Sequence, residues 1–186
     1  MQYDIGDRMA ALKLVEIPAR RENWAEAEFK GGAKSVLTLR SGHILVADEP
    51  PGFAGGMGGE NSGPTPTGFL CAALASDIPS MLNRIATELE LEIVSLRTRV
   101  QIAWNPRGIS GTPGIEPTPF EAVSDIWLDI AAGESAIARM REAYERRCPL
   151  YNIMRKAGCR MIDNWHVEKP KPRSAAPLNR RKRLRP

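Results

Sequence analysis

Residues 63–82 read GPTPTGFLCAALASDIPSML, and this stretch decides where the main helix of the fold lies. Thr65 is a residue type that caps helix N-termini, and Pro66 suits the first helical position. The apolar run at residues 69–75 is typical of a buried helix. The sequence therefore predicts a helix that begins at Pro66 and continues, with a break, to about Leu91.

Two residues interrupt this apolar helix. Asp77 is a carboxylate, and Pro79 has no N–H to donate to the carbonyl of Ala75, so the helix is expected to kink or restart here. Asp77 would then cap the second segment, because a carboxylate can accept from freed N–H groups at the positive end of a helix. On this interpretation Asp77 is a local structural residue.

Apolar patterns along the rest of the chain predict strands on both sides of this helix and helices after it. At residues 92–104, the apolar even-numbered positions from Val94 to Ile102 form one strand face. In chain order, the expected elements are a hairpin of strands 35–40 and 43–49, a glycine- and proline-rich loop at 50–66, the helix, strands at 92–104 and 123–131, helices at 133–148 and 150–158, and a strand at 159–167. This order indicates an α+β fold rather than a regular βαβ sheet.

Composition limits the class of protein. The 186 residues are 42% hydrophobic, which suits one domain with a real core, and no segment approaches the roughly 20 apolar residues of a membrane span. The N-terminus lacks the basic and apolar regions of a secretory signal. Cys71, Cys148 and Cys159 follow no metal-ligand spacing, so they indicate reduced thiols in a cytoplasmic protein. The glycine loop lacks the Lys-Ser/Thr of a phosphate-binding loop, and we expect neither a cofactor nor a metal.

The C-terminal end of the chain differs from the rest. Residues 169–186 read KPKPRSAAPLNRRKRLRP and hold eight of the 26 basic residues and none of the 22 acidic ones, so residues 1–168 carry a net charge of −4. Its prolines and its lack of apolar periodicity predict a disordered tail after a domain that ends at residue 168. The cations of this tail suit the phosphates of nucleic acid or an anionic membrane surface; the alternative is that they only keep the protein soluble.

Two stretches together resemble a known family. VADEPPGFAGGMGGENSGPTPTGFLCAALASD (46–77) and ERRCPLYN (145–152) resemble the OsmC/Ohr family of thiol peroxidases and their OsmC-like relatives, and the likeness extends over about residues 35–167. The resemblance implies an α+β fold and an intertwined homodimer, in which two long central helices pack against sheets made by both chains. It also implies a pocket for a small hydrophobic or peroxide-like ligand.

The resemblance further implies a mechanism and two site positions. In the family, a cysteine in the first central helix attacks the peroxide and becomes a sulfenic acid, which a second cysteine in a Cys-Pro turn resolves to a disulfide. The resolving position matches Cys148, but Asp77 occupies the attacking position. A carboxylate forms neither a sulfenic acid nor a disulfide, so Asp77 would instead contact a ligand or act as an acid or base. Cys71 is expected to face elsewhere on the helix as a small core residue.

Other features of the family pattern are missing or unassigned. Thr67 and Gly68 stand where many catalytic members have a glutamate, and Arg20, Arg21 and Arg40 are equal candidates for the family's catalytic arginine. We therefore expect an OsmC-like protein that has lost the two-cysteine peroxidase chemistry and has a binding, regulatory or structural role. One alternative is a thiol-dependent organic hydroperoxide reductase that uses the resolving cysteine. Another is a nucleic-acid-associated protein that binds through its tail.

Overall fold

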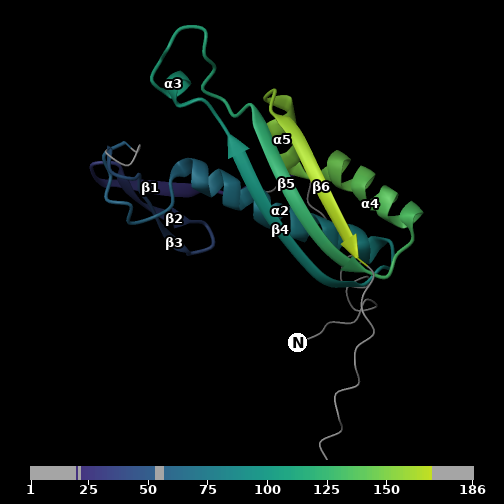
Figure 1. The fold of residues 1–186 in the computed structure, drawn as a ribbon. Coiled ribbons are helices and arrows are strands. Elements are labelled where there is room, and N and C mark those ends of the chain that lie inside the picture. The colour runs from purple at the N-terminus through teal and green to yellow at the C-terminus, as the bar shows by residue number, and fades with distance from the viewer. Residues whose placement is uncertain (1–19, 21, 53–56, 169–186) are drawn as a thin grey trace, which may run out of the picture.

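The computed structural model describes residues 20, 22–52 and 57–168, which form a three-stranded sheet covered by helices and a second sheet of shorter strands (Figure 1). The predicted basic tail at 169–186 lies outside the described residues. The elements in chain order are β1 (Ala25–Gly31), β2 (Lys34–Leu39), β3 (Ile44–Ala47), α2 (Pro66–Glu88), β4 (Ile93–Ala103), α3 (Pro106–Ile109), β5 (Glu121–Ile130), α4 (Glu134–Arg147), α5 (Pro149–Lys156) and β6 (Arg160–Glu168). None of the helices within these described ranges combines the length and the apolar character that crossing a membrane requires.

The strands form two separate sheets. β1, β2 and β3 are antiparallel neighbours in that order, and Gly42, with a φ of +83°, lies in the turn of the predicted hairpin between β2 and β3. β4 pairs antiparallel with β5, and β5 pairs parallel with β6. α4 and α5 form the crossover between these two parallel strands. The mixture of antiparallel strands, helices and one parallel crossover has the predicted α+β class.

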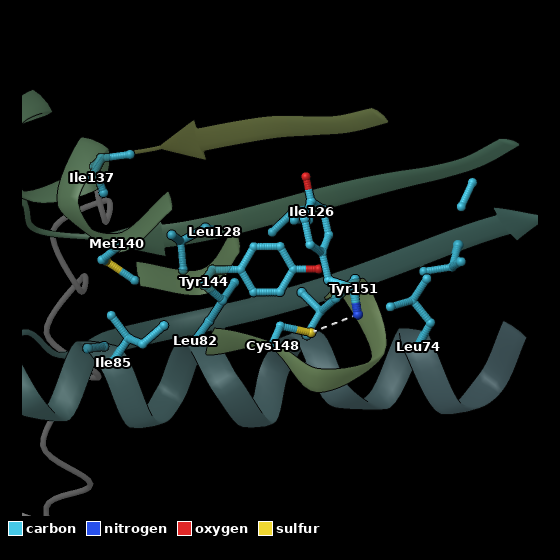
Figure 2. Packing of buried hydrophobic residues seen from close by; sticks show 14 of the residues in the cluster. Leu74, Leu82, Ile85, Ile126, Leu128, Ile137, Met140, Tyr144, Cys148 and Tyr151 are labelled. Carbon is cyan, nitrogen blue, oxygen red and sulfur yellow. Dashed lines mark hydrogen bonds between the residues drawn. The ribbon is translucent and has the colours of Figure 1, made fainter. Parts of the chain in front are cut away.

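The hydrophobic core lies between α2, α4 and α5 and one face of the β4–β5–β6 sheet (Figure 1). Every second residue of β5 is buried, as the predicted strand requires. Figure 2 shows Tyr144 lying between α2 and this sheet, surrounded by aliphatic side chains of both. The fully buried large side chains include Leu74, Ile78, Leu82, Ile126, Leu128, Met140 and Tyr144. The helices α2, α4 and α5, which carry the candidate site, all pack against this core.

One strand position departs from the predicted pattern. Val94 is 52% exposed, although the even-numbered alternation placed it on the same face as the buried Val100. The register of β4 against β5 shifts between Ile93 and Ser95. Because a bulge changes which side chains face the core, the alternation holds only after this point.

α2 continues through Pro79 as one helix, so the predicted restart of the helix at this position is wrong. Pro79 leaves the carbonyl of Ala75 without an N–H donor from the helix itself. The hydroxyl of Thr98 on β4 donates to that carbonyl, with the two oxygens 2.8 Å apart. A contact with the neighbouring strand therefore replaces the missing helical bond, and no restart is needed.

The β1–β2–β3 sheet lies beside the start of α2 and outside the layers of the main core (Figure 1). All residues of β1, a strand that the sequence patterns did not predict, are exposed. Phe29 is 71% exposed and Ile44 is 68% exposed. Small sheets gain independent stability from an apolar face packed on another layer. Phe29 and Ile44 lie on opposite faces of this sheet, and no other layer within the described residues covers either side chain.

Asp48 fixes the glycine loop against β3. Its buried carboxylate accepts from the N–H groups of Glu49, Glu60 and Ser62 at 2.9–3.1 Å and from the Ser62 hydroxyl at 2.8 Å. These bonds, above all the one from the N–H of Ser62, lower the pKa of Asp48 to about 2. A Cβ at Gly59 would lie 2.1 Å from the carbonyl oxygen of Glu49, so this close approach requires glycine.

Candidate functional site

Asp77 and Cys148 lie in contact, although they are 71 positions apart in the chain. The thiol of Cys148 donates to the carboxylate of Asp77, with Sγ and Oδ2 3.0 Å apart. Asp77 projects from the middle of α2, and Cys148 sits at the junction of α4 and α5. Packing of the helices thus brings together the two positions that the resemblance singled out. Their part in any reaction stays a prediction.

The α4–α5 junction fixes the position of Cys148. Its N–H donates to the carbonyl of Tyr144 at 2.8 Å, which ends α4. Its Sγ accepts from the N–H of Tyr151 at 3.4 Å, which caps the start of α5 (Figure 2). Pro149 takes the first helical position of α5, where an N–H would be unpaired in any case. The predicted end of one helix is therefore also the start of the next.

The Cys148 thiol is protonated at neutral pH. Its side chain is fully buried, and this burial is the main cause that raises the pKa of Cys148 to about 12. The hydrogen bond to Asp77 acts in the same direction, while the N–H of Tyr151 opposes it. The thiolate is the nucleophilic form of cysteine, and the raised pKa disfavours it at neutral pH, while the thiol donates to Asp77.

Asp77 is not a helix cap. Because α2 continues through this position, the neighbouring N–H groups stay in helical bonds, and Pro79 frees a carbonyl rather than a donor. The half-buried carboxylate of Asp77 accepts instead from Cys148. The cap interpretation assumed a broken helix and is wrong for that reason.

The other two cysteines lie away from this pair. Cys71 donates to the carbonyl of Val100 at 3.1 Å and packs against the core, in agreement with its predicted structural role. Cys159 is buried immediately before β6. Burial raises the pKa of both thiols. All three cysteines are free, and no cluster of His, Cys, Asp and Glu within the described residues could hold a metal ion.

Two of the three arginines that are candidates for the family's catalytic arginine, Arg20 and Arg40, lie near the first sheet. Arg20 forms an ion pair with Glu22, and Arg40 donates to the backbone carbonyl of the same residue. Arg20 and Arg40 line one cavity together with Asn23. Arg21 lies outside the described residues. Arg20 and Arg40 therefore lie close to the first sheet of their own chain and are not partners of the Asp77–Cys148 pair.

The start of α2 shows what replaces the glutamate that the family pattern expects there. Thr65 caps the helix as predicted, because its Oγ1 accepts from the N–H of Gly68 at 2.9 Å. The same oxygen lies 3.0 Å from Oγ1 of Thr67. The first turn of α2 contains no acidic residue, so this end of the helix has a hydroxyl cap where catalytic relatives are expected to have a carboxylate.

Sequence reasoning missed an ion pair beside Cys148. Nη2 of Arg147 donates to Oε1 of Glu88 at 2.8 Å, and Nη1 bonds the other carboxylate oxygen. Hydrogen bonding to Arg147 lowers the pKa of Glu88. The pair ties the end of α2 to the end of α4 and so supports the helix packing around the site. The only sequence signal was the basic last turn of α4, which does not identify a partner on another helix.

Comparison with known proteins identifies the class of this fold. A family model described as OsmC-like protein matches residues 59–161, more than half of the chain. The protein therefore belongs to the OsmC-like family. A comparison with curated proteins finds no match.

Solved structures share the fold at low sequence identity. An OsmC-like protein from Mycoplasma pneumoniae is 15% identical with a TM-score of 0.64, over 81% of this chain and 99% of that chain. An OsmC-like protein of unknown function from Vibrio cholerae is 11% identical with a TM-score of 0.64, over 78% and 99%. An organic hydroperoxide resistance protein from Legionella pneumophila is 19% identical with a TM-score of 0.55, over 81% and 99%. At these identities the likeness shows the fold alone.

Proposed function

We propose that this protein binds a small ligand at the Asp77–Cys148 site and does not reduce peroxides by the two-cysteine route. The main support is the 3.0 Å contact in which a buried, protonated thiol donates to a carboxylate. Thiol peroxidase chemistry needs a thiolate at the attacking position. A carboxylate stands at that position here, and it also raises the pKa of the remaining thiol.

The ligand is a small, mostly apolar molecule with one hydrogen-bond donor. Asp77 is half-buried whereas Cys148 is fully buried, so a ligand reaches the carboxylate first. Ala73 and Met81 lie one helical turn to either side of Asp77 and are also half-buried. An apolar body would contact these two side chains, while a hydroxyl of the ligand would donate to the carboxylate.

The functional unit is a homodimer in the cytoplasm. The strand register places Phe29 on one face of the β1–β2–β3 sheet and Ile44 on the other, and the exposed apolar side chain of Phe29 supports packing of its face against a second copy. Three free cysteines support a reducing compartment.

Peroxide consumption tests the proposed loss of chemistry. With an organic hydroperoxide and a lipoyl-type dithiol, we expect wild-type turnover no greater than that of free thiols. Asp77→Cys should restore some turnover, because its new thiol would lie beside Cys148, and Asp77→Ser is the matched control without a thiol. Robust wild-type turnover that is lost in Cys148→Ser would instead establish a hydroperoxide reductase that uses Cys148.

Binding is tested with cumyl alcohol, a neutral analogue of an aromatic hydroperoxide that carries one hydroxyl donor. We expect it to shift the NMR signals of residues around Asp77 in a saturable way. Asp77→Leu should weaken this binding by removing the acceptor. Equal binding by wild type and variant, or no binding by either, would count against a ligand site at the carboxylate.

A further inference from the structure

Three buried polar atoms beneath the sheet have no hydrogen-bond partner among the described residues: Ser124 Oγ, Tyr144 Oη and Asp163 Oδ1. They come from β5, α4 and β6. The side chains of Ser124 and Tyr144 are fully buried, and Asp163 is half-buried. An unpaired polar atom in a protein interior costs free energy, so three such atoms together need an explanation.

The three side chains gather in one place beside Cys148. Ser124 and Asp163 are direct partners in the parallel register of β5 and β6. Tyr144 packs edge-on against Trp165, with ring centroids 6.1 Å apart, and Trp165 shares a strand face with Asp163 two positions away. Figure 2 shows the Tyr144 hydroxyl at the end of the ring nearest Cys148.

The ionisation of these groups shows that they act on one another. Burial raises the pKa of Asp163, and the nearby Ser124 hydroxyl opposes this rise only in part. Burial also raises the pKa of Tyr144, and the carboxylate of Asp163 is the next cause of that rise. Side-chain hydrogen bonding between Ser124 and Asp163, and between Tyr144 and Cys148, also contributes to these shifts. The groups are therefore close enough to interact, although none of the three atoms has a partner with good hydrogen-bond geometry among the described residues.

We propose that one internal water molecule binds between Ser124, Tyr144 and Asp163. A water molecule can accept from two hydroxyls and donate to a carboxylate oxygen, which would satisfy all three atoms at once. This gives the water about three hydrogen bonds, the usual number for a buried water. The Cys148 thiol then has the carboxylate of Asp77 on one side and a hydrated polar cluster near Tyr144 on the other. This site is independent of the proposed ligand and of any peroxide chemistry.

Two single substitutions test the bridge by the sign of their effect on stability. Tyr144→Phe and Ser124→Ala each remove one hydroxyl. If a water bridges the cluster, each variant lowers the urea midpoint of unfolding, because the water loses a partner and the remaining atoms are less well satisfied. If the hydroxyls are simply unpaired, each variant raises the midpoint, because a buried unsatisfied group is removed, and this result would overturn the proposal.

Tyr151→Phe is the matched control, since Tyr151 packs beside Tyr144 but its hydroxyl is not one of the three atoms. We expect it to lower the midpoint less than Tyr144→Phe does. An equal loss would count against a specific role for the Tyr144 hydroxyl.

Direct observation needs no variant. A high-resolution crystal structure of the full wild-type chain should show one water within hydrogen-bond distance of all three atoms. Water relaxation dispersion in solution should detect a long-lived internal water in the same protein. A direct bond between Tyr144 and Asp163 with no water, or the absence of a long-lived water in solution, would overturn the proposal.

Discussion

The hydroxyl of Thr98 lies 2.8 Å from the carbonyl oxygen of Ala75 and donates to it. In a regular helix the partner of this carbonyl would be the N–H of the residue four positions later, which here is Pro79. β4 thus supplies the donor that α2 lacks. The proline is accommodated without a break, and Asp77 keeps its place on a continuous helix, facing Cys148.

Removing this donor should destabilise the fold. Thr98→Val keeps the shape of the side chain but leaves the Ala75 carbonyl unpaired, and we expect a loss of about 1–3 kcal/mol in the free energy of unfolding. Thr98→Ser retains the hydroxyl and should lose less. Urea denaturation of the three proteins measures the difference.

Measuring the cost of Thr98→Val in a Pro79→Ala background tests whether the proline is the reason that the fold needs the Thr98 hydroxyl. The N–H of the substituted residue can bond the Ala75 carbonyl, so Thr98→Val should cost less there than in the wild type. Equal costs in the two backgrounds would show that the Thr98 hydroxyl does not compensate for the proline.

Asp48 should make the fold sensitive to acid. Its pKa is about 2 in the folded protein against an ordinary value of 3.8, so the unfolded chain takes up the proton more readily. The stability that Asp48 contributes is complete above about pH 4 and is lost as the pH falls towards 2. Asp48→Asn should lower the urea midpoint at pH 7 and flatten its pH dependence in that window.

Glu142→Gln is the control for this prediction, because Glu142 is an exposed carboxylate on α4. It should leave both the midpoint and its pH dependence nearly unchanged. If Asp48→Asn retains the full acid sensitivity of the wild type, other carboxylates cause it.

The sequence predicted correctly those elements that depend only on residues close together in the chain. Thr65 and Pro66 identify the start of α2 because capping needs only adjacent residues, and the alternation of β5 identifies its buried face. The continuity of α2 was not predictable, because it depends on Thr98 in another element. The bulge near Val94 likewise depends on register against β5. Long-range pairing, rather than local propensity, decided each of these cases.

The candidate site was likewise predictable only where adjacent residues identify a position, and not where packing of distant elements decides a contact. The resemblance named Asp77 and Cys148 as two positions, but nothing in their spacing indicated that a thiol would donate to a carboxylate. That contact arises from the packing of α4 and α5 on α2. β5 pairs parallel with β6, which places Ser124 beside Asp163, and local sequence patterns could not predict this pairing.

The Asp77 carboxylate should slow the reaction of Cys148 with alkylating reagents. Because its hydrogen bond raises the pKa of the thiol, Asp77→Asn should lower that pKa and speed alkylation by iodoacetamide at pH 8. The measurement uses a Cys71→Ser, Cys159→Ser background, so that only Cys148 reacts. A change that appears equally in unfolded protein, or no change at all, would argue against a role for Asp77 in holding the thiol protonated.

The first sheet should hold two copies together. We expect a dimer mass in light scattering at micromolar concentration, with a largely apolar interface above roughly 2,000 Å² in total. Phe29→Asp places a charge on the uncovered surface and should shift the mass towards the monomer. Lys30→Asp lies on the other face of the sheet, which carries Ile44, and should shift the mass less if the interface lies on the Phe29 face. A monomeric wild type would reject the dimer.

The basic tail at residues 169–186 gives the last prediction. Its eight cations and lack of acids suit phosphate contacts, and because it contains no aromatic residue to stack on bases, we expect binding without sequence choice. If at least five of the cations contact duplex phosphates, log K should fall with log salt at a slope of about −4.5 or steeper.

Truncation after Glu168 should remove this binding and leave dimerisation and thermal stability nearly unchanged, because the predicted disordered tail contributes little packing. Fluorescence titration of labelled duplex DNA with both proteins at two salt concentrations measures the effect. Equal affinity of the full-length and truncated proteins would reject the tail as a nucleic-acid arm and favour its role in solubility.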